Sequence, residues 1–418
     1  MVDRKTHTIR VMHFADTHFG VELYGKPDPA TGMHSRLVDF RDALMRAIDL
    51  AVERGVSLAV FAGDAYRLRD PSQTHQREFA RCLRALTDRG VKVVMVTGNH
   101  DVPNVRGRAH AMDIYKTLAV GGVEVVNEPK VLKVETRDGD AQIAAMPYLV
   151  RGLQLAREEM ITKTAQELKR AMEARFYDWI EKLAGDCDPA IPTILLTHAW
   201  VSEARITPWQ EASINVNEPS IQASALARPE FDYVALGHIH RHQDLNRHSQ
   251  PPVVYSGSPY RMDFGERDEP KGFVYAEVWR GGAEYELVDV PSRALVDIDV
   301  QADGDDPTGT VVEEIRRHPI RDAIVRLTYR VPEESYSRIS EKLIREALAP
   351  AYWIAGIRVE VLRNRETRSR VLTESLDPRT ALATYLETSG ATAQRREELM
   401  AYAAPLFEEL AREEEVRP

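Results

Sequence analysis

Short apolar runs alternate with amphipathic stretches along the first 120 residues of the chain. The runs have the length of buried strands, and in the stretches between them apolar residues recur every three or four positions, as in helices. The predicted strands are residues 9–15, 57–62 and 92–97, and the predicted helices are residues 35–54, about 72–88 and about 108–118. Repeated strand–helix units predict an α/β fold with a largely parallel sheet buried between helices.

The pattern changes after Gly121 to shorter strands and one long helix. Strands are predicted at residues 123–126, 131–135, 142–146, 193–196, 233–236, 253–255, 273–278 and 284–290, and the helix at about residues 153–183. A domain boundary is expected near Pro291. Beyond it, strands at 294–300, 322–329 and 357–362 and helices at 310–317 and 336–348 predict a small α+β unit over 292–372. The remainder, 373–418, is expected to be helical and charged.

Five polar segments each follow a predicted strand directly. They are Asp16-Thr17-His18, Gly63-Asp64, Gly98-Asn99-His100-Asp101, Thr197-His198 and Gly237-His238-Ile239-His240. Ligand sites in an open α/β sheet form beyond the carboxyl ends of the strands, so all five segments are expected to meet at one rim. Alternate residues of an extended segment point to the same side, so each of the two Asp/His or His/His pairs could share a metal ion.

The residue types in these segments favour divalent metal ions. Carboxylate, imidazole and amide groups suit borderline to hard cations such as manganese, and no sulfur ligand is present. Eight candidate groups exceed the needs of one tetrahedral site: Asp16, His18, Asp64, Asn99, His100, His198, His238 and His240. Two ions about 3.5–4 Å apart, sharing a bridging carboxylate, are a recurring arrangement for phosphoester cleavage. A single such string would often be an ordinary buried histidine, but five in order at one location argue against coincidence.

The net charge and the cysteine content limit the classes of protein to which the chain can belong. The formal net charge of −10 argues against indiscriminate nucleic-acid binding, although cations in an active site would add positive charge there. Cys82 and Cys187 lie in no CxxC string, so neither a disulfide framework nor a thiolate zinc site is expected. No apolar run approaches the length of a membrane span, and the first residues are charged rather than signal-like. We expect a cytoplasmic protein with no membrane contact.

The order of the polar segments resembles that of the calcineurin-like metallophosphoesterases. Further strings resemble the SbcD and Mre-eleven DNA double-strand-break repair nucleases: Ala235-Leu-Gly-His-Ile-His240, Tyr255-Ser-Gly-Ser-Pro259, Asp263-Phe-Gly-Glu266, Glu269-Pro-Lys-Gly-Phe273, Asp377-Pro-Arg-Thr-Ala-Leu382 and Tyr385-Leu386. The resemblance spans nearly the whole chain, and the GSP and DFGE strings are its most specific part. It implies a calcineurin-like β-sandwich flanked by helices, a small α+β capping domain and C-terminal helices.

The resemblance also implies roles for individual residues. One ion would be held by Asp16, His18, Asp64 and His240, and the other by Asp64, Asn99, His198 and His238. The ions would be Mn²⁺, with Mg²⁺ as the alternative. His100 would contact the scissile phosphate and assist the leaving group. Asp101 is expected to orient His100 or to serve as a turn residue.

Arginines beside the segments are candidate phosphate contacts: Arg67, Arg69, Arg106, Arg108, Arg261 and Arg267. Arg67 stands where related nucleases often have a histidine that positions DNA for exonuclease action. A phosphate contact and a solvated surface residue are equally compatible with it. The basic run of Arg363, Arg365, Arg368 and Arg370 could line a DNA groove under the capping domain, but a solvated linker explains it as well.

Apolar stripes suggest two further contacts. Two predicted helices carry apolar stripes, one with Phe79, Leu83 and Leu86 and the other with Met112, Tyr115 and Leu118. These stripes could cover the sheet as ordinary core, or they could form the homodimer contact that the resemblance implies. Leu399, Tyr402, Leu406 and Leu410 form a stripe on a charged C-terminal helix. It could pack back onto the chain or dock on an SbcC-type coiled-coil ATPase. The chain has no GxxxxGK[ST] string, so ATP would have to be bound by that partner.

The function expected from these features is a Mn²⁺-dependent DNA nuclease subunit of a double-strand-break repair complex. It would act as a 3′–5′ exonuclease on double-strand ends and as an endonuclease on hairpins and single strands, associated with the nucleoid. Two alternatives are weighed: a small-molecule phosphodiesterase or phosphatase of the same superfamily, and a DNA-end-binding scaffold with a decayed site. The C-terminal units argue against the first, and the complete set of candidate ligands argues against the second.

Overall fold

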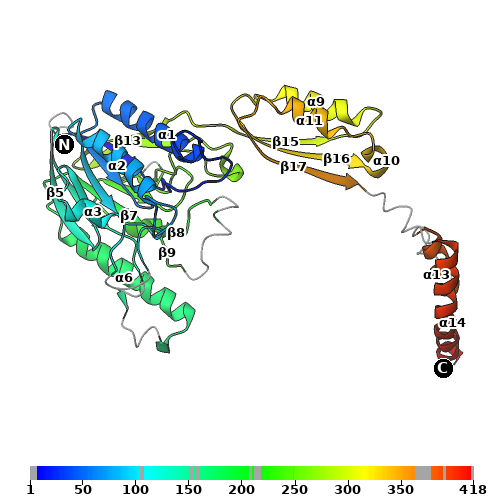
Figure 1. Ribbon diagram of the computed structural model, residues 1–418. Coiled ribbons are helices and arrows are strands. Elements are labelled where there is room, and N and C mark those ends of the chain that lie inside the picture. Colours follow the sequence, from blue (N-terminus) through cyan, green and yellow to red (C-terminus); the bar gives the residue numbers. More distant parts are fainter. Residues whose placement is uncertain are drawn as a thin grey trace. The chain divides into compact units, whose positions relative to one another are not determined.

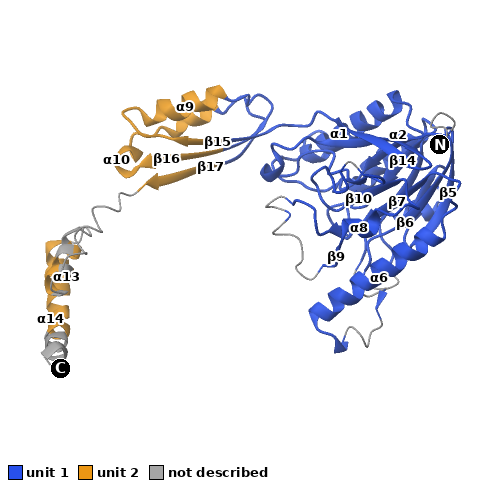
Figure 2. Cartoon of the chain, turned by 180° about the vertical axis from the view of Figure 1, so that it is seen from behind, with its two compact units in different colours: residues 1–297, 318–326, 348–356 blue, residues 298–317, 327–347, 357–418 orange. Residues whose placement is uncertain are grey.

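The computed structural model describes residues 7–103, 108–150, 154–155, 161–206, 210, 218–247, 249–362, 378–388 and 392–415. The chain divides into two compact units (Figure 2). Unit 1 comprises residues 1–297, 318–326 and 348–356, and unit 2 comprises residues 298–317, 327–347 and 357–418. All five polar segments lie in unit 1.

Two six-stranded sheets form the body of unit 1 (Figure 1). The first has the order β14(Gly282–Asp289), β13(Gly272–Trp279), β1(Ile9–Phe14), β2(Leu58–Phe61), β3(Lys92–Val96), β4(Val123–Val126). The second has the order β11(Gln243–Asp244), β12(Val253–Tyr255), β10(Tyr233–Gly237), β7(Thr193–His198), β6(Gly139–Met146), β5(Lys130–Thr136). Strands β1 to β4 are parallel, as are β6, β7, β10 and β12, whereas β13, β14, β5 and β11 pair antiparallel with their neighbours.

Alternating side chains of the central strands build separate cores on the two faces of each sheet. Val11 and Val60 contribute to the core that also contains Ile143 and Leu196 of the second sheet, so the two sheets face each other there. Met12, Phe61 and their neighbours in the first sheet pack instead against helices. Unit 1 is therefore a β-sandwich with helices on both outer faces, as the resemblance implies. The largely parallel sheet predicted from the strand–helix alternation is confirmed for β1 to β4, but one of its faces packs against the second sheet instead of against helices.

The helices of unit 1 divide between the two outer faces (Figure 1). Helices α1(Ser35–Glu53), α2(Gln73–Thr87) and α3(Asp113–Thr117) bury apolar residues in the core of the first sheet. Helices α6(Ala165–Gly185) and α8(Ala223–Leu226) do so on the second sheet. The predicted start of the long helix at residue 153 is wrong, because Thr164 and Glu167 form a capping box that begins α6. The helix predicted at 108–118 is confined to α3.

Shorter elements complete unit 1. They are the two-stranded sheet of β8(Trp200–Val201) and β9(Ser220–Ile221) and the 3₁₀ turn η1(Phe264–Glu266). Asp263 caps η1 by accepting a hydrogen bond from the Gly265 amide, 2.7 Å away. The turn therefore fixes the backbone of the DFGE string.

The C-terminal third contains a three-stranded sheet in the order β15(Leu295–Gln301), β16(Ile324–Pro332), β17(Trp353–Leu362). Its helices are α9(Pro307–Arg317), α10(Glu333–Tyr336) and α11(Glu341–Ala347), so the helix predicted over 336–348 is two short helices. Helices α13(Pro378–Thr388) and α14(Ala393–Glu415) pack against each other. The four arginines at 363–370 lie outside the described residues. None of the described helices is long and apolar enough to cross a membrane.

Candidate metal centre

The polar segments follow strands of both sheets. Asp16 and His18 follow β1, Asp64 follows β2 and Asn99 follows β3, all in the first sheet, whereas His198 ends β7 and His238 follows β10 in the second. The parallel strands of each sheet run in one direction, so their carboxyl ends lie at one edge. The two edges meet, because His238 N donates hydrogen bonds to the Asp16 carboxylate at 3.0 and 3.1 Å. The prediction that the segments converge is confirmed, but they come from two sheets.

The backbone at this rim is strained. Asp16, His18, Asp64 and His238 have φ values of 53°, 40°, 60° and 104°, in the left-handed region that residues with a side chain rarely adopt. Such strain persists only where the surrounding structure enforces it, and it concentrates at functional sites. Glycine is required at Gly98 and Gly237, because a Cβ atom there would overlap the Asp64 carboxylate and the Ala62 carbonyl oxygen.

One oxygen of Asp64 lies between histidines of the two sheets. Asp64 Oδ2 is 3.6 Å from His18 Nε2 and 3.5 Å from His198 Nε2. Asp64 Oδ1 instead accepts a hydrogen bond of 2.8 Å from the His100 amide, which fixes the carboxylate. Burial opposes ionisation of this carboxyl, but His198, His100 and His18 together lower its pKa. Asp64 therefore has the position and charge of a carboxylate that could bridge two cations.

Two groups of candidate ligands flank Asp64. On one side, ligand atoms of Asp16, His18 and His240 lie within 4.8 Å of one another. On the other, Asn99 Oδ1 lies 2.9 Å from His198 Nε2 and 3.1 Å from His238 Nδ1. Each group resembles half of a two-metal site in number and type of donor. All seven residues predicted as metal ligands are thus brought together.

The buried donors fit divalent cations. Asp16 is fully buried, and burial together with the Asp64 carboxylate raises its pKa well above the usual value. A positive charge between the two carboxylates would offset their repulsion. Burial also lowers the pKa of His198 to about 4, so its ring is neutral at pH 7. His198 Nδ1 lies 2.7 Å from the Ala62 carbonyl oxygen and donates to it, which leaves the lone pair of Nε2 for a cation.

His100 differs from the other histidines of the site. Its ring is partly exposed, and Nδ1 donates to the Arg67 carbonyl oxygen at 2.9 Å, which directs Nε2 away from that contact. The ring packs edge-on against His18 with a centroid separation of 4.9 Å. His100 is therefore placed at the entrance of the site, where an incoming phosphate could meet it.

Asp101 does not orient the His100 ring. Its two carboxylate oxygens accept hydrogen bonds from the backbone amides of Asp64, Ala65 and Gly98 at 2.8 to 2.9 Å. The expected catalytic role through His100 is corrected to that of a turn residue, which holds the Asp64 loop against the Asn99 loop. Burial and the nearby Asp64 raise the pKa of Asp101 to about 8.

The arginines predicted to bind substrate fall into three groups. Arg261 is used internally, because its guanidinium donates to the carbonyl oxygens of Arg267 and Glu269 and to Ser292 Oγ. Its assignment as a phosphate contact is therefore corrected to a structural role. Arg69 is exposed and reaches the Asn99 carbonyl oxygen at 3.3 Å, and Arg67 is half-buried beside it. Arg106 lies outside the described residues.

The comparisons with known proteins agree with this geometry. The sequence pattern described as "Calcineurin-like phosphoesterase" matches residues 9–242, more than half of the chain. The chain belongs to the calcineurin-like phosphoesterase family. Membership makes it a metal-dependent phosphoesterase, as its sequence predicts.

Among characterised relatives, this phosphoesterase is similar to nuclease subunits. It is 26% identical to the SbcD subunit of the nuclease SbcCD of Escherichia coli over 87% of both chains. It is 25% identical to the protein of the same name from Bacillus subtilis, over 65% of this chain and 67% of that one. It is 23% identical to "DNA double-strand break repair protein Mre11" of Haloferax volcanii, over 76% of this chain and 60% of that one. The resemblance seen in the sequence motifs is confirmed.

Several residues at this phosphoesterase site were not predicted. Glu266 Oε1 lies 2.8 Å from His240 Nδ1, and Lys271 Nζ lies 3.1 Å from Glu266 Oε2. Glu218 Oε1 is 3.5 Å from His238 Nε2, and Gln210 Nε2 donates to the His238 carbonyl oxygen. Glu266 and Lys271 belong to the DFGE and EPKG strings, so a signal for them was present. Nothing in the sequence marks Glu218 or Gln210.

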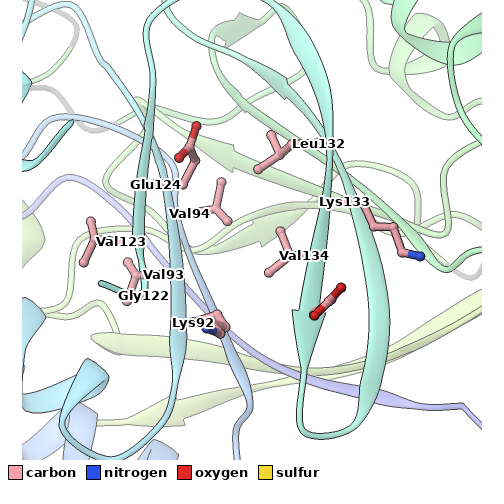
Figure 3. A pocket seen from close by; sticks show the side chains of 10 residues that line it. Lys92, Val93, Val94, Gly122, Val123, Glu124, Leu132, Lys133 and Val134 are labelled. Carbon is pink, nitrogen blue, oxygen red and sulfur yellow. The ribbon is translucent and has the colours of Figure 1, made fainter. Parts of the chain in front are cut away.

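A separate cavity of about 560 Å³ lies between β3 and β4 of one sheet and β5 of the other (Figure 3). None of the predicted site residues lines it. Of its charged lining residues, Glu124 pairs with Lys130 and Lys133 pairs with Asp140. The charges of Glu124 and Lys133 are thus compensated within the protein, and the two other charged lining residues, Lys92 and Glu135, have opposite signs.

Proposed function

We propose that the chain is the nuclease subunit of a DNA double-strand-break repair complex and hydrolyses phosphodiester bonds with two Mn²⁺ ions. It would act as a 3′–5′ exonuclease on double-strand ends and as an endonuclease on hairpins and single strands. The position of Asp64 Oδ2, 3.5 to 3.6 Å from one histidine of each donor group, carries the two-metal part of the proposal. The names of the relatives support the DNA part.

The assignment of residues to the two ions follows from the two donor groups. Asp16, His18 and His240 would hold one ion and Asn99, His198 and His238 the other, with Asp64 shared between them. Mn²⁺ suits this mixture of carboxylate, imidazole and amide ligands, and Mg²⁺ would accept its oxygen donors. When bound, the pair supplies Lewis acidity, which acidifies water and neutralises charge on phosphoryl oxygens.

The side chains at the entrance would act on the phosphate. His100, with Nδ1 donating to the Arg67 carbonyl, presents Nε2 to a phosphoryl oxygen or to the leaving oxygen, to which the imidazolium form of the ring would donate the Nε2 proton. Arg67 and Arg69 lie on the same loop as Asp64 and would contact flanking phosphates of the strand. Water-excluding burial of Asp16 and Asp64 strengthens the electrostatic interactions at the reacting phosphate.

The direct test is cleavage of end-labelled linear duplex and hairpin DNA by the purified chain with Mn²⁺, with Mg²⁺ and after chelation. We expect Mn²⁺-dependent shortening of the duplex from its 3′ ends and opening of the hairpin, both abolished by the chelator. Intact DNA together with hydrolysis of a small phosphodiester would instead indicate the small-molecule alternative. That outcome would count against the proposal if an added SbcC-type ATPase failed to restore cleavage.

A homodimer through α2 and α3 is part of the proposal. Five of the six residues of the predicted stripes are buried within unit 1. These five therefore cover the sheet as part of the core, which was one of the two interpretations of the stripes. Two apolar side chains of this region remain exposed, Ile114 at 49% and Leu118 at 68%. They line an open groove between α2 and α3 together with Ala80 and Leu83. A second copy of the same surface would bury Ile114 and Leu118, the two side chains that unit 1 leaves exposed.

Replacing both Ile114 and Leu118 by glutamate is expected to convert a dimer into a monomer. Each replacement would bury an unpaired charge and forfeit about 1.5–3 kcal/mol of apolar burial in the interface. Size-exclusion chromatography with light scattering measures the change. Ile161→Glu, at a side chain that is 73% exposed, is the matched control and should leave the mass unchanged. A double variant that stays dimeric would place the subunit contact elsewhere.

The C-terminal helices are proposed to bind an SbcC-type coiled-coil ATPase. Tyr385 on α13 is 55% exposed, and Tyr402 and Leu406 on α14 are 83% and 54% exposed. Large apolar side chains on a charged helix suit docking onto a partner helix. In this proposal residues 1–291 form the nuclease domain, 292–372 the capping domain over DNA and 373–418 the partner-binding segment. Retained ATPase binding by a chain truncated from about Leu376 would contradict it.

A further inference from the structure

Three of the strings that resemble the SbcD and Mre-eleven nucleases converge on one histidine, His240. Ser258 of the GSP string donates its backbone amide to the His240 carbonyl oxygen at 3.0 Å. Lys271 of the EPKG string donates Nζ to the same oxygen at 2.8 Å. Glu266 of the DFGE string contacts the His240 ring at Nδ1. Backbone and ring of His240 are thus held by residues that lie 18 to 31 positions further along the chain.

The two nitrogens of the His240 ring face different surroundings. Nε2 lies 3.1 Å from His18 Nε2, inside the donor group with Asp16. Nδ1 lies 2.8 Å from Glu266 Oε1, on the opposite side of the ring. A carboxylate can only accept, so the proton must be on Nδ1 and the lone pair on Nε2. This is the tautomer that His240 needs in order to bind an ion through Nε2.

Glu266 is itself held in a fully buried position. Its exposure is 0%, and Oε2 accepts a hydrogen bond from the Met262 amide and forms an ion pair with Lys271 Nζ, both at 3.1 Å. Lys271 is 1% exposed and also contacts Ser258 Oγ and Glu269 Oε2 at 3.0 Å. A buried ion pair of this kind contributes little net stability, and removing one partner alone is costly. Glu266 contacts the ring nitrogen of His240 that faces away from the proposed ion, which points to a role in orienting His240.

We propose that Glu266, anchored by Lys271, is a positioning residue that fixes the tautomer and ring orientation of His240 for one of the two ions. The inference rests on the proposed two-metal function and adds a residue outside the ligand set. Because His240 belongs to one donor group alone, the effect of Glu266 is confined to one ion. The ion held by Asn99, His198 and His238 is independent of it.

Calorimetric titration of the metal-free full-length chain with Mn²⁺ tests the proposal. The wild type is expected to bind two ions. In Glu266→Gln the affinity of one site for Mn²⁺ should fall by about 10- to 100-fold, while the other site keeps its affinity. This is the usual effect of losing a carboxylate that is hydrogen-bonded to a histidine ligand. Glu269→Gln is the matched control, because it removes a carboxylate from the same lysine without touching His240. It should bind both ions as the wild type does.

A second variant distinguishes the loss of His240 positioning from a general loss of folding stability. Glu266→Asp keeps the charge opposite Lys271 but withdraws the carboxylate from His240 Nδ1 by about one methylene. It should show the same loss at one site, with the melting temperature of the metal-free protein kept close to that of the wild type. Unchanged affinities at both sites, or equal losses at both, would overturn the positioning role. A wild type that binds fewer than two ions would refute the two-metal function itself, so the two failures are distinguishable.

Discussion

Asp64→Asn is expected to reduce DNA cleavage by about 1,000-fold or more, which corresponds to about 4 kcal/mol of activation free energy. The amide keeps the shape of the side chain and can still accept the hydrogen bond of the His100 amide at Oδ1. It lacks the negative charge that would neutralise two cations between His18 and His198. We therefore expect fewer than two Mn²⁺ ions per chain in metal analysis, together with loss of activity.

Asp289→Asn is a suitable control for this variant. Asp289 is exposed at the end of β14, and the substitution makes the same change of charge outside the site. It should retain two ions and normal cleavage. Full metal content and normal cleavage in Asp64→Asn would contradict the bridging assignment, because no other carboxylate of the described residues is within 4 Å of both His18 and His198.

His100→Ala is expected to lower the cleavage rate by about 10²- to 10⁴-fold while both ions remain bound. The ring lies at the entrance, fixed through Nδ1 to the Arg67 carbonyl, and outside the proposed ligand set. Its loss should therefore appear in kcat rather than in metal content. Parallel measurement of single-turnover cleavage and of bound Mn²⁺ separates the two effects.

His75→Ala provides the comparison for His100→Ala. His75 lies on helix α2, and its Nε2 is 3.2 Å from Glu22 Oε1. It contributes no atom to either donor group. Its removal should change neither rate nor metal content. If His100→Ala lost an ion as readily as Asp64→Asn, His100 would be a ligand, and the proposed division between catalysis and metal binding would be wrong.

Much of the fold was predictable because strands of a sandwich are buried on both faces and appear as continuous apolar runs. The bounds of β4 and β12 agree with the sequence, and α1 agrees within one residue. The partition into two sheets was not predictable from these runs. In β1, Val11 faces the other sheet and Met12 faces the helices, yet both positions are simply apolar. An apolar run therefore does not reveal what covers each face.

The site was predictable to the extent that its residues follow strands directly. Asp64 and His198 are recognisable because each stands at the end of a buried strand. Glu266 and Lys271 act through hydrogen bonds to His240, and such contacts across 26 to 31 positions leave no periodic signal. Arg261 was predicted wrongly for a different reason. Its position beside the motifs suggested phosphate binding, but its guanidinium donates to the carbonyl oxygens of Arg267 and Glu269 in the same loop.

The order of strands in the sandwich gives the metal centre a place in folding. Strand β1, which carries Asp16, pairs with β13 on one side and β2 on the other, and β13 follows every strand of the second sheet in the chain. The first sheet is complete only after every strand of the second has been synthesised. The donors of each proposed ion come from both sheets, so neither ion has its full set of ligands until the two sheets have packed together. Binding of either ion would therefore report that the two sheets have packed together, which makes metal content a measure of correct folding.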